Sequence, residues 1–345
     1  MPPPVRFEIL PPFPRKGSVK TRTGASGWRG RVIGANNRSG SLGSVTVVEE
    51  FEEQRPRLFW LAYRLLGSAS EAEDAVQDAY LRLHLADRAA IRSLPGWLTN
   101  AVTNICINRL TSARARREVY PGPWLPEPVA TGAGVLGPLD TAEQRDSVSI
   151  ALLTLMERLS PAERASFVLR EAFAYSHREV AEILETSEAN ARQLHRRARQ
   201  RLGAPAPRTR PDTADWRRLV ERFFTAARSG DVDGLVAVLA ADVTSTADGG
   251  GKVAAARRVI SGRHRAANYF ARALSRAMPD LDLQLDVAEV NGEPALVAFD
   301  GATLAGVLFV EIVDDRIAAV RFAANPDKLG FLAGQLSHPA GLSGS

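Results

Sequence analysis

The chain has 345 residues, 45% of them hydrophobic, so it is long enough for two or three separately cored domains rather than one. Its net charge of +5 identifies no anionic partner for the folded part, because residues 1–44 carry eight Lys and Arg against one Glu, which is +7 and leaves −2 for the remainder. The chain has a single cysteine, Cys106, which excludes a disulfide framework and is interpreted as a core thiol. It has no long uncharged apolar run that could span a membrane, and its N-terminus lacks the apolar centre of a signal peptide. We therefore expect a soluble cytoplasmic protein.

The first segment, residues 1–44, combines Pro, Gly, Ser and Arg without any apolar period. This composition predicts disorder. A sharper hypothesis is that the segment results from the choice of start codon, with Val45 as an alternative start, because the periodic pattern begins just after it. The intact mass of the natural protein would distinguish the two.

Residues 45–118 have a helical pattern throughout. Gly67-Ser68 separates a first apolar stripe from a second, and a third helix is predicted to open near Pro95-Gly96-Trp97. The stripes consist of Leu58, Leu61, Ala62 and Leu65, then Ala72, Val76, Ala79 and Leu83, then Leu98, Ala101, Val102 and Ile105. Residues 119–145 hold five prolines and four glycines, which predicts a linker.

A second helical block, residues 146–204, is predicted to contain a helix-turn-helix. Ser160 with Glu163, and Ser176 with Glu179, form two capping boxes that fix two helix starts, and Ser187 can cap a third helix. The third helix has an apolar side and a side of Arg and Gln, which bond base edges and phosphates in a major groove. An isolated Arg-rich helix is as often simply solvated; the capped helix and turn before it favour DNA binding. Candidate contacts are Ser187, Asn190, Arg192, Gln193, Arg196, Arg197 and Gln200.

After a linker at 205–212, residues 213–332 are predicted to form an α+β domain. Helices are expected over 213–229, 232–240 and 266–277, followed by strands. Apolar and polar residues alternate over 281–287, and the turn signals Asn291-Gly292, Asp300-Gly301 and Asp314-Asp315 separate the later apolar runs. We expect an antiparallel meander packed on helices, and a disordered tail at 333–345.

Residues 159–164, 175–184 and 187–199 resemble region 4 of the extracytoplasmic-function sigma factors. Residues 71–83 and 97–105 are similar to region 2 of the same family, in the family's order. The resemblance implies a specificity subunit of RNA polymerase and not an enzyme. It also implies that region 2 holds the β′ clamp helices and opens the −10 element, and that region 4 meets the β flap and reads the −35 element. The position often occupied by glycine in such turns is Glu185 here, so the turn is expected to be less tight.

Two faces of region 2 agree with this assignment on residue chemistry alone. One is acidic but includes an apolar residue, which suggests a contact with core polymerase rather than a purely solvated face: Glu71, Asp74, Gln77, Asp78 and Leu81. The other carries short hydrogen-bonding side chains followed by a cation, which suits the −10 element: Asn100, Thr103, Asn104 and Arg114. Trp97 is either a stacking residue there or a core anchor.

The C-terminal domain looks like the SnoaL-like, polyketide-cyclase-type cone, an extension that a subgroup of these sigma factors carries. Its marks are Trp124, Leu125, Pro126, Glu127 and Pro128 in the linker, Asp248, Gly249, Gly250, Gly251 and Lys252 in the cone, and Asn325, Pro326, Asp327, Lys328 and Leu329 near the end. The resemblance implies regulation in cis through intramolecular contact. A ligand-sensing cone remains open, as does catalysis, for which Asp248 with His264 is the least implausible pair. The alternative prediction for the whole chain is a helix-turn-helix transcriptional regulator with a ligand-sensing or enzymatic cyclase-like domain. No cofactor, metal or membrane partner is expected.

Overall fold

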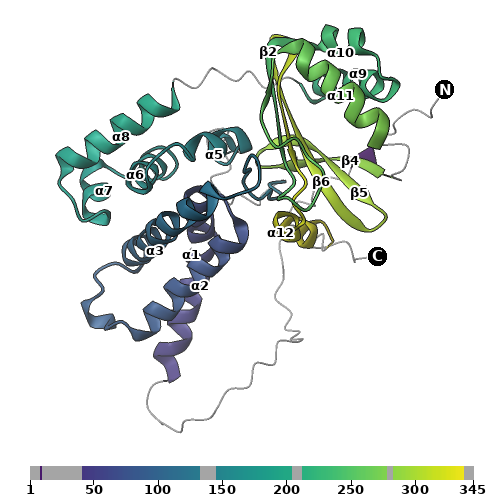
Figure 1. The fold of residues 1–345 in the computed structure, drawn as a ribbon. Coiled ribbons are helices and arrows are strands. Elements are labelled where there is room, and N and C mark those ends of the chain that lie inside the picture. Colours follow the sequence, from purple (N-terminus) through teal and green to yellow (C-terminus); the bar gives the residue numbers. More distant parts are fainter. Residues whose placement is uncertain (1–7, 10–40, 133–144, 204–211, 278–282, 338–345) are drawn as a thin grey trace.

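The computed structural model describes residues 8–9, 41–132, 145–203, 212–277 and 283–337. A helical module lies against an α+β domain built on one sheet (Figure 1). This arrangement confirms the predicted fold class. No helix in the described ranges is long and apolar enough to cross a lipid bilayer.

Three long helices form the first half of the helical module: α1 (Ser41–Leu66), α2 (Ala69–Leu85) and α3 (Leu94–Glu118), with a short 3-10 turn, η1 (Arg88–Ala90), before α3. Gly67 has a φ of +67°, which allows the chain to reverse, and the Ser68 hydroxyl accepts a hydrogen bond from the backbone N–H of Glu71 at the start of α2. The predicted apolar stripes are buried together in one core.

The segment 1–44, expected to be disordered, contributes two ordered pieces. α1 begins at Ser41, and Glu8–Ile9 forms strand β1, which pairs in parallel with β4 (Leu283–Val290). Each residue added to a helix that has already formed contributes one hydrogen bond, and an open sheet edge can pair with a strand through main-chain groups alone. The start of α1 and strand β1 can therefore form without an apolar period in the sequence. The remaining residues of this segment lie outside the described ranges.

The second half of the helical module contains the predicted helix-turn-helix. Its helices are α5 (Ile150–Met156), α6 (Pro161–Glu171), α7 (His177–Ile183) and α8 (Glu188–Leu202). Both predicted capping boxes are formed, and the Ser187 side chain caps α8. Glu185 adopts the left-handed φ of +50°, and Thr186 donates a hydrogen bond to the Ala181 carbonyl at 2.9 Å. The turn is therefore as tight as glycine would make it.

Glu185→Gly is expected to stabilise the chain, because glycine adopts a left-handed φ without steric cost. The gain should be about 0.5–1 kcal/mol in the free energy of unfolding, measured by urea denaturation. Glu182→Gly is the matched control, since Glu182 lies inside α7 and should lose about 1 kcal/mol. Destabilisation by both replacements would contradict this account of the turn.

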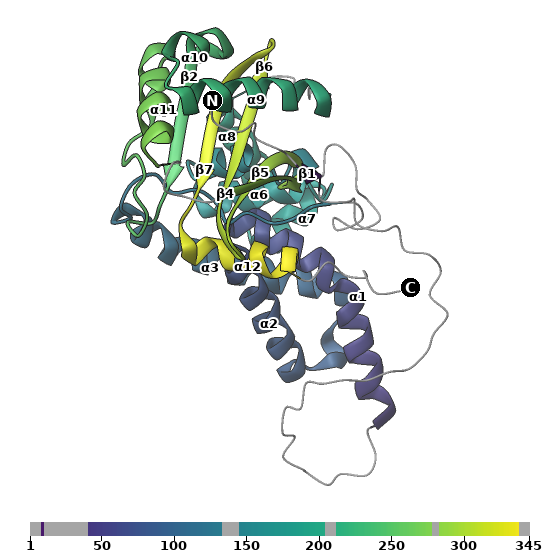
Figure 2. The ribbon, with the colours of Figure 1, turned by 90° about the vertical axis from the view of Figure 1, so that its right-hand side faces the viewer.

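The C-terminal domain is a sheet covered by helices at its two ends. α9 (Thr213–Ser229), α10 (Val232–Val238) and α11 (Arg263–Ala277) lie at one end, and α12 (Pro326–Ser337) lies at the other, next to α1 (Figures 1 and 2). The strands are β2 (Leu239–Asp248), β3 (Ile260–Ser261), β4, β5 (Glu293–Asp300), β6 (Thr303–Val313) and β7 (Arg316–Ala323), in the order β1-β4-β5-β6-β7-β2-β3. β4 to β7 form the predicted antiparallel meander, and β2 joins it in parallel with β7.

Two details of this domain differ from the sequence prediction. The expected helix 232–240 ends at Val238, and β2 follows it without a break. β2 is hard to recognise, because several of its buried positions hold small or polar residues such as Ser245 and Ala247 rather than large apolar ones. The expected disordered tail begins too early as well, since α12 continues to Ser337 and packs Ala333 and Leu336 on the core.

Candidate nucleic-acid interface and its intramolecular contacts

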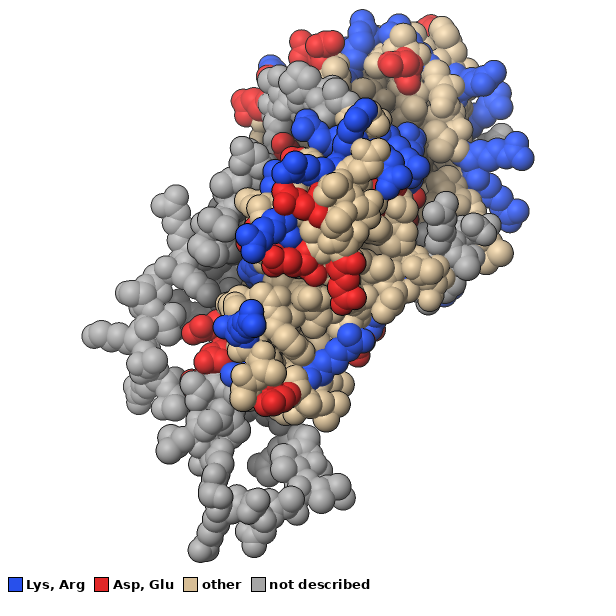
Figure 3. Space-filling model, turned by 90° about the vertical axis from the view of Figure 1, so that its left-hand side faces the viewer, with Lys and Arg blue, Asp and Glu red and all other residues tan. Residues whose placement is uncertain are grey.

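The outer side of α8 is an exposed cationic surface of the helix-turn-helix. Ala191, Leu194 and Ala198 are buried on the inner side. All seven residues predicted from the sequence are exposed on the outer side: Ser187, Asn190, Arg192, Gln193, Arg196, Arg197 and Gln200. Figure 3 shows Lys and Arg gathered over the upper half of the side of the molecule on which α8 lies. The arrangement suits a helix that enters a major groove.

Glu163, a residue that the sequence identified only as a cap, holds α8 in place. Its side chain is 3% exposed, accepts the hydrogen bond that completes the α6 capping box, and forms ion pairs with Arg197 at 3.5 Å and with Arg201. On the same helix, His195 Nε2 lies 2.7 Å from the Glu171 carboxylate of α6. These contacts fix the rotation of α8 about its axis, so its outer side is oriented before any DNA binds.

The face of α3 assigned to the −10 element is only partly accessible. Asn100 and Asn104 are half-buried and hydrogen-bonded to each other, and Trp97 is half-buried against the core. Thr103 is fully buried, and its hydroxyl has no hydrogen-bond partner among the described residues, so its assignment as a contact is wrong for this conformation. The side chain of Arg114 lies outside the described residues.

Thr103 is buried because α3 has two inward sides rather than one. Residues 98, 101, 102 and 105 face α1 and α2, as predicted, while Thr99, Thr103, Cys106 and Leu110 form a second buried stripe at helical spacing. α6 and α7 pack on α3, and Tyr175 lies 3.2 Å from the Thr99 hydroxyl. Burial raises the pKa of the Cys106 thiol above its usual range, as fits a core residue.

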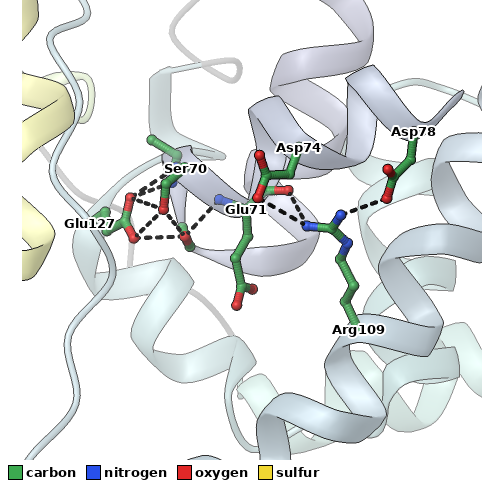
Figure 4. Close-up of polar contacts among 8 residues, drawn as sticks. Ser70, Glu71, Asp74, Asp78, Arg109 and Glu127 are labelled. Atoms are coloured by element: carbon green, nitrogen blue, oxygen red, sulfur yellow. Dashed lines mark hydrogen bonds and ion pairs between the residues drawn. The ribbon is translucent and has the colours of Figure 1, made fainter. Parts of the chain in front are cut away.

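The acidic face of α2 is open and preorganised by an arginine from α3 (Figure 4). Asp74, Gln77 and Leu81 are exposed, and Leu81 is 53% exposed. Arg109 donates hydrogen bonds to the Asp78 carboxylate at 2.6 Å and to the Glu71 carbonyl at 3.1 Å, and lies 3.8 Å from Asp74. Arg109 was not among the predicted residues, because its contacts join segments more than 30 residues apart in the chain.

The predicted linker is not loose where the structure describes it: residues 125–132 are buried between the helical module and the cone. Glu127 lies at the N-terminus of α2, where its carboxylate accepts hydrogen bonds from the Ser68 hydroxyl at 2.7 Å, the Ala69 N–H at 2.8 Å and the Ser70 N–H at 3.0 Å (Figure 4). A helix N-terminus stabilises such an anion, so Glu127 ties this segment to region 2.

Asp248 and Lys328 join the three predicted motifs at a buried ion pair. Lys328 Nζ lies 2.7 Å from the Asp248 carboxylate, donates to the Leu125 carbonyl at 2.7 Å, and lies 4.2 Å from the centre of the Trp124 ring. Asp248 also accepts from the Leu125 N–H at 2.8 Å and from the Tyr120 hydroxyl at 2.5 Å. Burial is the largest cause that raises the pKa of Tyr120 above its usual range, and the hydrogen bond to the Asp248 carboxylate is the second. The phenol therefore keeps its proton and is the donor in this hydrogen bond.

These contacts do not support the alternative catalytic pair. The Asp248 carboxylate is occupied by the linker and by Lys328, whereas His264 is exposed near the start of α11. The three glycines after Asp248 form a turn: Gly250 and Gly251 have φ values of +60° and +73°, and a Cβ on Gly250 would meet the Asn325 side chain at 2.4 Å. Gly250 therefore serves close packing against the third motif.

The β4–β5 turn forms a second docking point that the sequence identified only as a turn. Asn291 is fully buried, and its amide donates to the Tyr63 hydroxyl at 2.6 Å and to the Val148 carbonyl at 2.8 Å. Its side-chain oxygen accepts from the Val129 N–H at 3.1 Å. One side chain of the cone thus contacts region 2, the linker and the segment before α5.

Asn291→Ala is expected to lower the free energy of unfolding by about 3 kcal/mol, because it leaves several buried polar groups without partners and places alanine at a φ of +53°. Urea denaturation of the full chain measures the loss. Asn268→Ala is the matched control, since Asn268 is exposed on α11 and donates only to the His264 carbonyl within its own helix. Equal small losses in both variants would show that Asn291 does not anchor the cone.

Comparison with known proteins agrees with this architecture. Residues 51–116 match the model of sigma-70 region 2, residues 149–202 that of sigma-70 region 4, and residues 220–320 that of the SnoaL-like domain. The chain is 38% identical over 289 residues to the ECF RNA polymerase sigma factor SigJ of Mycobacterium tuberculosis, covering 81% of this chain and 92% of SigJ. It is 31% identical over 288 residues to the probable ECF RNA polymerase sigma factor SigI of that organism, covering 82% and 94%.

A solved structure extends the likeness to three dimensions. The crystal structure of the M. tuberculosis extracytoplasmic function sigma factor SigJ superposes with a TM-score of 0.64 at 36% identity, covering 82% of this chain and 98% of that one. Both helical regions and the cone are present here in a single chain. The chain therefore belongs to the family of extracytoplasmic-function RNA polymerase sigma factors.

Proposed function

We propose that the chain binds core RNA polymerase through the acidic face of α2 and reads promoter DNA with α8 and α3. The observation that carries this is the outer side of α8, where every Arg and Gln predicted to contact DNA is exposed and Glu163 fixes the helix. The proposed partner of α2 is the pair of β′ clamp helices, and the proposed partner of region 4 is the β flap. On the DNA, α8 would contact the −35 element and α3 the −10 element. We place this activity in the cytoplasm.

We further propose that the cone controls this activity in cis and performs no catalysis. Its support is the set of buried contacts that Asp248, Lys328 and Asn291 make with the linker and the helical module. Phe331 of α12 also stacks on Phe59 of α1, with ring centres 5.6 Å apart.

In vitro transcription with core polymerase tests the proposal. The full chain is compared with versions that end at Pro207, without the cone, and at Ala324, without Lys328 and Phe331. We expect promoter-directed transcripts from the full chain and a changed yield from the version ending at Ala324, because that version loses the buried ion pair. Unchanged yield would contradict control in cis, and no transcript from any version would contradict the sigma activity.

A further inference from the structure

The cone carries a strongly cationic stretch that the sigma regions do not explain. Residues 249–277 contain no Asp or Glu, and seven basic residues: Lys252, Arg257, Arg258, Arg263, Arg265, Arg272 and Arg276. A solvated protein surface usually mixes both signs of charge. A stretch of this length without a carboxylate is therefore a candidate surface for an anionic partner.

Four of these arginines form one exposed surface, the cationic face: Arg257, Arg258, Arg265 and Arg272. The loop that carries the first two leads into β3, and β3 packs on α11, the helix that carries the others. Figure 2 places α11 along one edge of the upper part, and Figure 3, from the opposite side, shows Lys and Arg projecting from that edge.

Two carboxylates that lie near the loop are already paired with lysines. Asp248 is buried against Lys328, and Asp327 pairs with Lys252 at 2.6 Å. Within the described ranges, none of the four arginines of the cationic face forms an ion pair. Arginine presents a planar fork of donors that matches phosphate as well as carboxylate oxygens, so the choice between these partners depends on what lies beside the cationic face.

The cationic face also adjoins the end of the helix assigned to the −10 element. α3 ends at Glu118, and Gly122, four residues later, lies so close to the loop that a Cβ on it would be 3.5 Å from the Arg257 Cα. A Cβ on Gly251 would similarly lie 2.9 Å from Pro121. The loop is thus held against the chain just after α3, at the end of the helix that carries Arg114, whereas the candidate contacts at residues 97–104 lie toward the other end.

We infer that the cationic face is a second DNA-binding surface, which contacts the phosphate backbone of duplex DNA beside the segment bound by α3. As a surface of phosphate contacts it reads no sequence. It adds salt-dependent affinity and makes the cone a part of the DNA-binding surface. The inference rests on the proposed function only for the identity of the duplex, promoter DNA.

The test measures binding of the full chain, without polymerase, to a short fluorescent duplex at several salt concentrations. Replacing Arg257, Arg258, Arg265 and Arg272 together by glutamine should make the slope of log affinity against log salt shallower by about 3–4, since each lost phosphate contact removes about 0.9. Affinity near 50 mM salt should fall at least about tenfold.

The matched control replaces four arginines of α9, Arg217, Arg218, Arg222 and Arg228, by glutamine. It changes the net charge equally, but α9 lies on the side facing the viewer in Figure 2, away from α8, and carries Asp215 and Glu221 among its arginines. Its slope should stay within about 0.5 of the unmodified chain. Circular dichroism confirms that both variants are folded.

Equal slopes for the two variants would overturn the inference. So would an unchanged slope accompanied by weaker binding of the cationic-face variant to anionic lipid vesicles or to core polymerase, because the face would then serve one of those partners. Neither result bears on sigma activity, which core-polymerase binding and transcription measure separately.

Discussion

Asp248→Ala is expected to detach the cone from the helical module. The replacement leaves the ammonium of Lys328, which is 10% exposed, buried without its carboxylate, and removes the acceptor of the Tyr120 hydroxyl and the Leu125 N–H. Breaking a buried ion pair by removing one partner costs about 3–5 kcal/mol. Urea denaturation should show this loss, and limited proteolysis should cut the segment around residues 119–132 faster.

Asp327→Ala is the matched control, since Asp327 belongs to the same group of motifs and also pairs with a lysine. That pair is exposed, with side-chain exposures of 54% for Lys252 and 61% for Asp327, so the loss should be at most about 1 kcal/mol. Adding Lys328→Met to Asp248→Ala should recover part of the stability, because it removes the isolated charge. Equal effects of Asp248→Ala and Asp327→Ala would show that the buried pair does not hold the cone.

Leu81→Glu is expected to weaken binding to core polymerase about 30-fold or more, while leaving the free energy of unfolding within about 0.5 kcal/mol. Leu81 is 53% exposed at the C-terminal end of the acidic face and is the one apolar residue of the five assigned to that face. A carboxylate there would have to be desolvated at the interface. Titration of labelled chain with core polymerase measures the change in affinity.

Val313→Glu is the control for this prediction, because Val313 is 43% exposed at the end of β6, far from α2. Its affinity should equal that of the unmodified chain. If Leu81→Glu also binds core polymerase normally, the acidic face of α2 is a solvated surface, and region 2 contacts the polymerase elsewhere.

The sequence predicted the local structure well because local interactions specify it. The two capping boxes, the cap at Ser187 and the Asn291-Gly292 turn all depend on residues within a few positions of one another, and each is present. Helix ends were predicted less well, because apolar periodicity does not indicate how far a helix continues. The structure starts α1 at Ser41 and ends α12 at Ser337, both outside the predicted bounds.

Contacts between distant segments could not be read from the sequence in the same way. The motifs indicated that Asp248 and Lys328 matter, but not that they pair, and nothing local shows that Asn291 meets Tyr63. Thr103 was misassigned for a related reason. Its polar side chain suits a nucleic-acid face, and its burial depends on where α6 and α7 pack on α3, which the spacing within α3 does not specify.

Stoichiometric binding to core RNA polymerase is the most direct test of the account. Core enzyme without a specificity subunit is mixed with the purified full chain and separated by size-exclusion chromatography. We predict a one-to-one complex that survives separation and that Leu81→Glu weakens. Elution of the chain apart from the polymerase under conditions in which another sigma factor binds would contradict the assignment of the helical module.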